Sequence, residues 1–118
     1  MKANELRIGN LIKHHDKTIT VAGIVRNTIY YESKELCFDS NIGEYNPFQP
    51  IQLTEEWLLK FGFVEEFENK FYKDSIAIEV FENECILYIG YFVDLAINYV
   101  HQLQNLHFAL TGEELAVA

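Results

Sequence analysis

The 118-residue sequence lacks any apolar run that approaches the roughly 20 residues needed to span a bilayer as a helix. Apolar stretches such as 85–88 and 91–93 are only as long as a strand. The opening MKANELRIGN also lacks the continuous apolar segment of a signal peptide. We therefore expect a cytoplasmic protein with no membrane partner.

Cysteine is scarce, since Cys37 and Cys85 are the only two. Both have apolar neighbours, which is typical of buried thiols that pack as small hydrophobic side chains. No CxxC pair indicates redox chemistry. Buried, reduced thiols are the favoured interpretation, and a disulfide between the two is the alternative.

The sequence motifs of nucleotide, metal and nucleophile sites are also missing: there is no GxxxxGKS, GxxxxGKT, GxGxxG, GxSxG or HExxH. His14, His15 and Asp16 offer ligand atoms. However, adjacent strand residues point to opposite faces, and a metal site needs three or four converging ligands. His101 and His107 project from a helix in different directions. We predict no catalytic residue, no cofactor, no metal and a solvated loop around His14.

The sequence is rich in apolar residues. Apolar residues make up 49 % and aromatic residues 14 %, more than is typical of disordered chains. A chain of this length buries roughly two-thirds of the surface that it exposes when unfolded. We predict one folded domain over 1–118 with one core. It would comprise a β lobe at about 1–40, a connector at 41–53 and a helix–sheet–helix lobe at about 54–118.

Charge is negative overall and uneven along the chain. The net charge is −9, with five basic and two acidic residues in 1–30 and four basic and 16 acidic residues in 31–118. An acidic surface keeps a protein soluble, and it also complements a basic partner. Phosphate would be repelled by most of this surface, so nucleic acid is an unlikely partner except through the N-terminal part.

The first 40 residues have the pattern of short strands, and 40–53 is expected to be irregular. Turns are expected near Gly9 and Asn10, at 14–17 and at 26–27. The predicted strands are 18–25, 28–32 and 35–39. Together they predict an antiparallel β-meander or a small open barrel.

The second half predicts a short helix at 54–61 followed by a second antiparallel sheet, and hence an α+β fold. Thr54 is a suitable N-cap, and Gly62 is suited to the left-handed conformation that ends a helix. The strand-like segments are 63–67, 71–73, 76–81, 85–91 and 95–97.

A closing helix is predicted at about 99–110, with Asn98 as its N-cap and Gly112 just after its end. At 100° per residue, one face carries four side chains that are expected to pack in the core: Tyr99, Leu103, Leu106 and Leu110. The opposite face is uncharged and carries His101, Gln104, Asn105 and Phe108.

Phe108 is a large aromatic residue on this polar face, and two interpretations remain open. The C-terminal tail, 113–118, or a neighbouring strand would cover it in the first. In the second, the four residues form a partner-binding face, because interface centres are depleted of charge. A two-fold homodimer through this helix is its simplest form.

Three blocks of the sequence resemble a family of small proteins of uncharacterised activity from Bacteroidetes genomes, prophages and phages. The blocks are YVHQLQNLHFALTGEEL at 99–115, MKANELRIGN at 1–10 and PIQLTEEWLLKFGF at 50–63. His107 stands where many members have tyrosine. The resemblance implies a phage or mobile-element context and supplies no activity.

The leading hypothesis is therefore a non-enzymatic protein-interaction module of phage or mobile-element type. One alternative is an acidic inhibitor of a host defence protein that binds nucleic acid. Another is a nucleic-acid contact through the N-terminal β lobe, where aromatic residues lie near basic ones.

Overall fold

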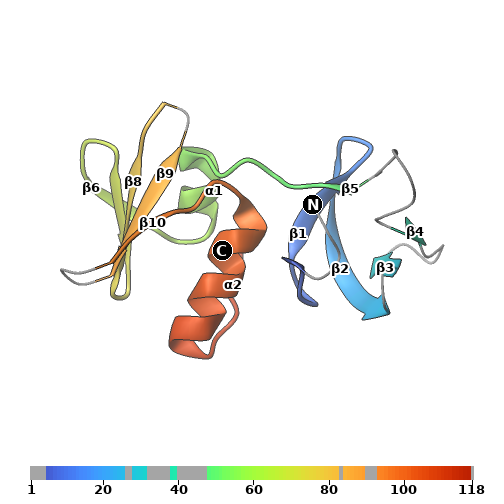
Figure 1. Ribbon diagram of the computed structural model, residues 1–118. Coiled ribbons are helices and arrows are strands. Elements are labelled where there is room, and N and C mark those ends of the chain that lie inside the picture. Colours follow the sequence, from blue (N-terminus) through green and yellow to red (C-terminus); the bar gives the residue numbers. More distant parts are fainter. Residues whose placement is uncertain are drawn as a thin grey trace.

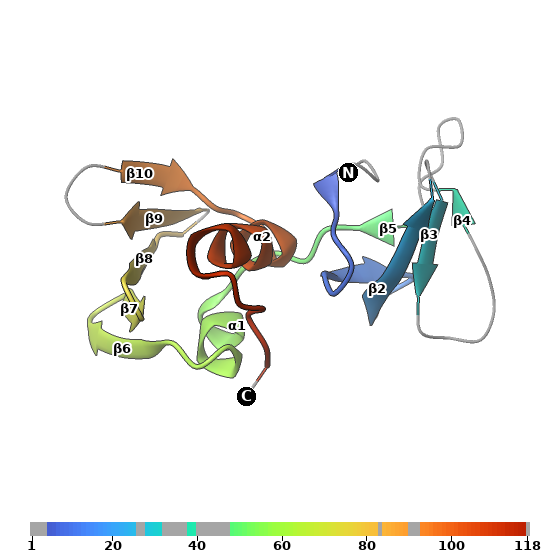
Figure 2. The same cartoon turned by 90° about the horizontal axis from the view of Figure 1, so that it is seen from below.

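The computed structural model describes residues 5–25, 28–31, 38–39, 48–82, 84–89 and 93–117. These residues form two antiparallel sheets and two helices, which confirms the predicted α+β fold (Figure 1). Helix α2 (Val100–Thr111) lies between the two sheets in both ribbon views (Figures 1 and 2). Neither α2 nor α1 (Glu55–Lys60), the two helices in this part of the chain, is long and apolar enough to cross a bilayer.

The first sheet is a meander of four strands, and a fifth strand that the sequence did not predict is added at its β1 edge. Its strand order is β4-β3-β2-β1-β5. The strands are β1 (Leu11–His14), β2 (Lys17–Val25), β3 (Thr28–Tyr31), β4 (Phe38–Asp39) and β5 (Phe48–Gln49). The β5 strand pairs with β1 inside the segment that was expected to be irregular. The predicted turn at 26–27 and residues 40–47 of the connector lie outside the described residues.

The tight turn between β1 and β2 confirms the predicted hairpin. His15 and Asp16 occupy it with φ values of 48° and 66°. Both angles lie in the left-handed region that two-residue hairpin turns require. Farther along β2, the pairing register shifts between Val21 and Gly23, a bulge that bends this strand.

Helix α1 begins and ends where the sequence predicted. The hydroxyl of Thr54 accepts a hydrogen bond from the backbone N–H of Trp57 at 3.4 Å. Gly62 follows the helix with φ 89°, a conformation that costs a side chain energy but that glycine adopts freely.

The second sheet has the order β10-β9-β8-β7-β6 and consists of consecutive antiparallel neighbours. Its strands are β6 (Val64–Phe67), β7 (Lys70–Lys73), β8 (Ile76–Val80), β9 (Cys85–Ile89) and β10 (Val93–Ala96). The predicted strands are therefore present, with ends that differ by a few residues. Both helices lie on the side of this sheet that faces the first sheet (Figure 2).

Helix α2 begins one residue later than predicted, because Tyr99 rather than Asn98 is its N-cap. The side-chain oxygen of Gln102 accepts hydrogen bonds from the backbone N–H groups of Asn98 and Tyr99, at 3.0 and 3.1 Å. Gln102 therefore satisfies donors that the helix leaves free. The helix ends at Gly112, as expected, with φ 75°.

The buried side of α2 differs from the predicted leucine stripe. Leu103 is fully buried, but Leu110 is 46 % exposed and Leu106 is only partly buried. The buried side chains of the helix are Val100, His101, Leu103, Gln104 and His107. Because the helix packs against residues from both lobes, its buried arc is wide and includes the polar side chains.

The described residues form two hydrophobic clusters rather than the single predicted core. The larger cluster lies between the second sheet and the helices, with Leu58, Phe61 and Leu103 among its fully buried members. The smaller lies in the first sheet and consists of Leu6, Ile12, Val21, Ile29 and Phe48. Cys85 is a buried free thiol of the larger cluster, as predicted, and Cys37 lies outside the described residues.

Candidate functional site

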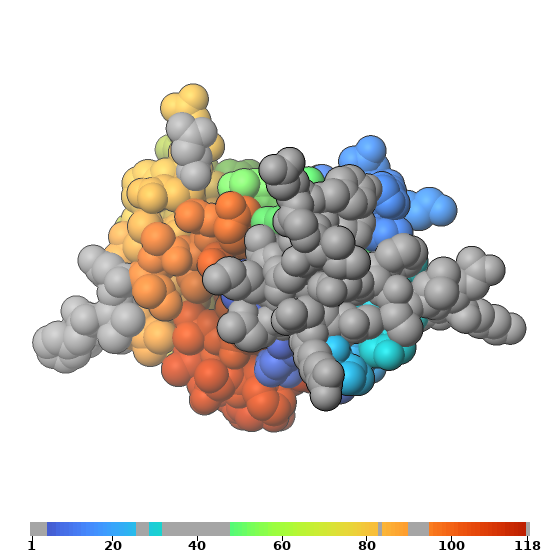
Figure 3. Space-filling view, turned by 45° about the vertical axis from the view of Figure 1, so that its right-hand side comes forward, coloured from blue at the N-terminus to red at the C-terminus, as the bar shows by residue number. Residues whose placement is uncertain are grey.

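The predicted partner-binding face of α2 does not point outward as a whole. His101 and Gln104 are each 3 % exposed and Asn105 is partly buried, while Phe108 is 39 % exposed. The expectation of an outward position is therefore wrong for His101 and Gln104, while Asn105 is partly buried and Phe108 is exposed. In the space-filling view, dark-blue atoms of the N-terminal segment lie against the orange and red atoms of α2 (Figure 3).

Gln104 and Asn105 bond to the segment that leads into β1. The Gln104 side chain accepts a hydrogen bond from the backbone N–H of Leu11 at 2.8 Å and donates one to the carbonyl of Gly9 at 3.2 Å. The Asn105 oxygen accepts from the side-chain amide of Asn10 at 2.8 Å, and its amide donates to the carbonyl of Glu5 at 3.1 Å. These side-chain amides therefore provide hydrogen-bond partners for the backbone N–H of Leu11 and the backbone carbonyls of Gly9 and Glu5.

Arg7 covers Phe108 and is held in place by the C-terminal tail. Its guanidinium lies 4.3 Å from the centre of the Phe108 ring and donates to Asn105 at 3.1 Å. Two further bonds reach the carboxylate of Glu114, at 2.6 and 3.2 Å. The hydrogen bonds from Arg7 hold the pKa of Glu114 below its usual value. The tail therefore takes part in covering Phe108, through the arginine that it binds.

Three segments that are far apart in the sequence meet at this junction. Residues 5–11 bond to α2 as described above, and the strand-like segment before α1 bonds to the beginning of α2. The backbone N–H of Leu53 donates to the carbonyl of Asn98, and that of Val100 donates to the carbonyl of Ile51, both at 2.9 Å. The uncharged residues on α2 thus form an internal polar joint between the lobes. The amide side chains of α2 indicated a surface that forms hydrogen bonds with a partner. The sequence did not reveal that this partner is the N-terminal segment of the same chain.

The other histidine of α2, His107, is also internal. His107 is 3 % exposed, and its Nδ1 lies 3.0 Å from the carbonyl of Glu113. Its Nε2 lies 3.6 Å from the carboxylate of Asp74 in the β7–β8 turn. His107 therefore contributes to the packing between α2, the C-terminal tail and the β7–β8 turn.

Beside this joint, α2 forms an open groove with β10. The groove has a volume of about 500 Å³ and is lined mainly by apolar side chains, among them Leu95, Ile97, Leu106 and Ala109. Asn105 and Glu5 also line it, as does His101 at 3 % exposure. Burial lowers the pKa of His101, opposed by Glu5. Within the described part of the chain, its Nδ1 has no hydrogen-bond partner.

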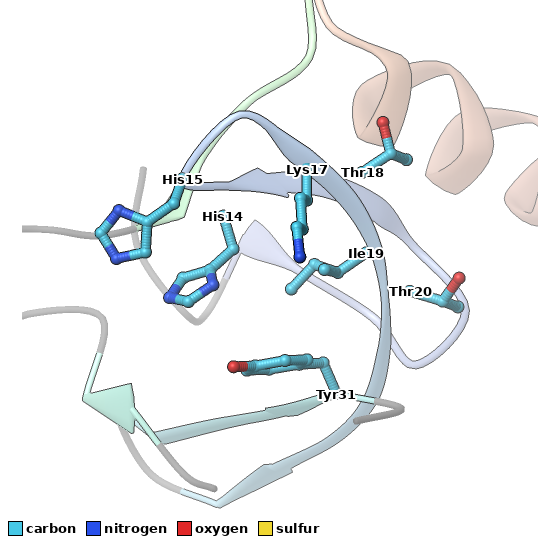
Figure 4. A pocket seen from close by; sticks show the side chains of 7 residues that line it. All are labelled: His14, His15, Lys17, Thr18, Ile19, Thr20 and Tyr31. Carbon is cyan, nitrogen blue, oxygen red and sulfur yellow. The ribbon is translucent and has the colours of Figure 1, made fainter. Parts of the chain in front are cut away.

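A second hollow, of about 410 Å³, lies in the first lobe. The side chains of His14, Lys17 and Tyr31 point toward one another there (Figure 4). The ring of His14 lies 5.2 Å from that of Tyr31 and 4.3 Å from that of His15, between centroids. Burial, and secondarily His15, lowers the pKa of His14.

The argument that His14 and His15 point to opposite faces is wrong, because His15 occupies the left-handed turn rather than a strand. His15 and Asp16 are nevertheless exposed, as the predicted solvated loop requires. Among the described residues, no three His, Cys, Asp or Glu side chains converge as metal ligands.

Comparisons with protein-family models, with curated proteins and with solved structures found no match. The geometry of the junction, the groove and the hollow is therefore the basis for a functional proposal.

Proposed function

We propose that this chain is a non-enzymatic protein-interaction module, of the phage or mobile-element type that its sequence resembles. The observation that carries the proposal is the apolar groove between β10 and α2. Exposed apolar surface that is concave is typical of sites that bind a partner or ligand. The contact surface in this proposal is the part of α2 that lines the groove, which includes His101 and Asn105 of the predicted face but not Gln104.

The internal joint strengthens this choice of surface. Gln104 and Asn105 already use their side-chain amides within the chain. A partner at that side would have to break these bonds and leave buried backbone groups unpaired, at about 1–3 kcal/mol for each. Docking in the groove leaves the bonds from Gln104 to Gly9 and Leu11 in place, because Gln104 does not line the groove.

The test compares partner capture by the wild type and by Ala109→Glu. Ala109 lines the groove and is exposed, so a glutamate there adds charge to the contact surface without disturbing the core. Leu59→Glu is the matched control, because Leu59 is 56 % exposed on α1 and does not line the groove. In quantitative affinity purification from the native host, Ala109→Glu should fail to capture specific partners that the wild type and Leu59→Glu both capture.

Light scattering of the wild type then separates a foreign partner from a second copy of the chain. Equal capture of every partner by the wild type and Ala109→Glu, with a monomeric wild type, would contradict the proposal.

A second candidate is a nucleic-acid contact at the hollow of the first lobe. Lys17 supplies a positive charge there, and the His14 and Tyr31 rings offer stacking surfaces. Gel shifts at low salt should then show binding to single-stranded probes that Lys17→Glu abolishes. Lys70→Glu, an exposed lysine of the second sheet, is the matched control. Absence of any shift with the wild type removes this candidate.

A third candidate is an acidic inhibitor of a basic host protein, based on the excess of 16 acidic over four basic residues in 31–118. Such binding weakens strongly with ionic strength, because salt screens exposed charges. Affinity that is unchanged between low and high salt would count against it.

A further inference from the structure

We propose that the groove binds an extended partner segment that pairs with the free edge of β10 as an additional strand, with apolar residues alternating with basic ones. This inference rests on the proposed interaction function and names the chemistry of the partner. Strand addition to an open sheet edge is a general mode of peptide recognition, in which backbone hydrogen bonds supply affinity and side-chain pockets supply specificity.

The backbone of β10 is available for such pairing. The backbone N–H of Ile97 donates to the carbonyl of Cys85 at 2.8 Å, so Ile97 bonds toward β9. In an antiparallel pair, bonded and non-bonded residues alternate, so Leu95 bonds toward β9 as well. The N–H and C=O groups of Asp94 and Ala96 then point away from β9. Strand β10 is the outermost strand on this side of the described sheet (Figure 2).

The opposite edge of the same sheet is protected, which makes the β10 edge distinctive. Strand β6 has a register shift between Glu65 and Phe67, and Glu65, Glu66 and Glu68 lie along it or directly after it. Bulges and charged side chains are the usual means of preventing an edge from pairing. By contrast, β10 keeps a regular register with β9 over all four residue pairs.

The groove next to this edge can receive side chains from an added strand. Leu95 lies on the same face as buried Leu87 and Ile97, yet it is 44 % exposed. Leu106 and Ala109 line the opposite wall on α2. Every second side chain of a pairing strand would enter this apolar space, while the others would face solvent.

His101 forms part of the wall of the groove. Its ring is 3 % exposed, and its Nδ1 has no hydrogen-bond partner within the described residues. The Nδ1 atom itself is shielded from solvent, so His101 contributes its ring to the wall of the groove rather than an accessible binding nitrogen.

Charge determines which extended segment fits. The net charge of −9, concentrated in 31–118, and Glu5 in the groove lining favour a segment with lysine or arginine at its solvent-facing positions. The same charge disfavours a second copy of this chain, because two such copies repel each other.

The test uses ¹⁵N-labelled full-length protein and three synthetic peptides. The first alternates valine or leucine with lysine, and the second has the same composition but is spaced for an amphipathic helix. The third is the first with proline at the pairing positions. We expect the first peptide alone to shift the amide signals of Leu95, Ala96 and the α2 residues 102–109. Amide exchange at Asp94 and Ala96 should slow at least tenfold on binding.

Two variants and one control sharpen the test. Ala96→Pro removes an outward N–H without breaking a bond to β9, which an edge strand tolerates. We expect it to weaken peptide binding by about tenfold, the equivalent of one or two hydrogen bonds. Ala109→Glu is expected to weaken binding of the apolar side chains further, and Leu59→Glu should bind as the wild type does. Amide spectra of each variant verify that it is folded.

Several results would overturn the inference and leave the proposed interaction function standing. These are preferential binding of the helical peptide, or no peptide binding while Ala109→Glu still loses its partners. If the wild type is a dimer and Ala96→Pro dissociates it, the β10 edge pairs with a second copy of the chain instead. If removal of residues 2–4 makes the peptide bind more tightly, the first residues of the same chain compete for this edge. Equal binding of all three peptides would indicate nonspecific charge attraction.

Discussion

The two lobes differ in what stabilises them. Among the described residues, the second has a cluster of 14 buried residues drawn from its sheet, both helices and the adjoining segments, whereas the first has a cluster of five. Small cores rarely supply enough burial to fold alone. The first lobe compensates with the polar joint to α2, made by Arg7, Asn10, Gln104 and Asn105. We infer that the second lobe is the folding unit and that the first depends on docking to it.

The largest expected effect comes from the cluster of the second lobe. Leu58→Ala should destabilise the protein by about 3 kcal/mol, because it empties a fully buried site. Denaturant unfolding measures this change, and hydrogen exchange should show protection lost in both sheets. Leu59→Ala is the matched control, because the neighbouring Leu59 is 56 % exposed and should cost roughly 0.5 kcal/mol. If the first sheet stays protected in Leu58→Ala, the first lobe does not depend on the second for its stability.

The next effect concerns the joint itself. Gln104→Leu should cost about 2 kcal/mol, because the N–H of Leu11 and the carbonyl of Gly9 lose their partner in a buried site. Hydrogen exchange should accelerate in β1 and β2 while β8 and β9 keep their protection. Gln49→Leu makes the same substitution at an exposed position of β5 and serves as the control. Uniform loss of protection in both sheets would show that the lobes unfold together.

A smaller effect is expected from the ion pair that fixes the arginine over Phe108. A double-mutant cycle of Arg7→Ala and Glu114→Ala should give a coupling energy of about 0.5–1 kcal/mol, since the pair is partly exposed but bidentate. The coupling should fall when salt is added. Zero coupling at low salt would mean that the joint relies on the amides alone.

The smallest effect near neutral pH is that of His101. Because burial lowers its pKa in the folded protein, the unfolded chain takes up a proton first as the pH falls below about 6.5. Folding stability should therefore decline below that pH, and His101→Gln should remove this part of the decline. A decline in His101→Gln as steep as that of the wild type would argue against this contribution.

Glu114 contributes to acid sensitivity in a lower range. Its pKa is lowered in the folded state by Arg7, so its stabilising effect is present above the ordinary glutamate pKa of about 4.3 and is lost as the pH falls farther. Titration of Glu114→Gln should show a weaker decline in this range. A decline identical to that of the wild type would contradict the assignment.

Local patterns predicted the elements well because local physics decides them. Thr54 and Gly62 delimit α1 as expected, since capping depends on neighbours a few residues away. Strand β5 was missed because the residues around it look like a loop, and only pairing with β1 makes it a strand. The leucine stripe of α2 was predicted as the sole core face because an amphipathic pattern cannot show that a helix is covered from two sides.

The sequence alone determined the α+β class, most helix and strand positions, the acidic charge and the unusual polar side of the last helix. The tertiary structure decided what that polar side does, because Gln104 and Asn105 meet backbone groups that lie more than 90 residues away in the chain. It also located the open edge of β10 beside an apolar wall of α2. Contacts of this kind depend on which distant segments meet, which hydrophobic periodicity and capping signals do not encode.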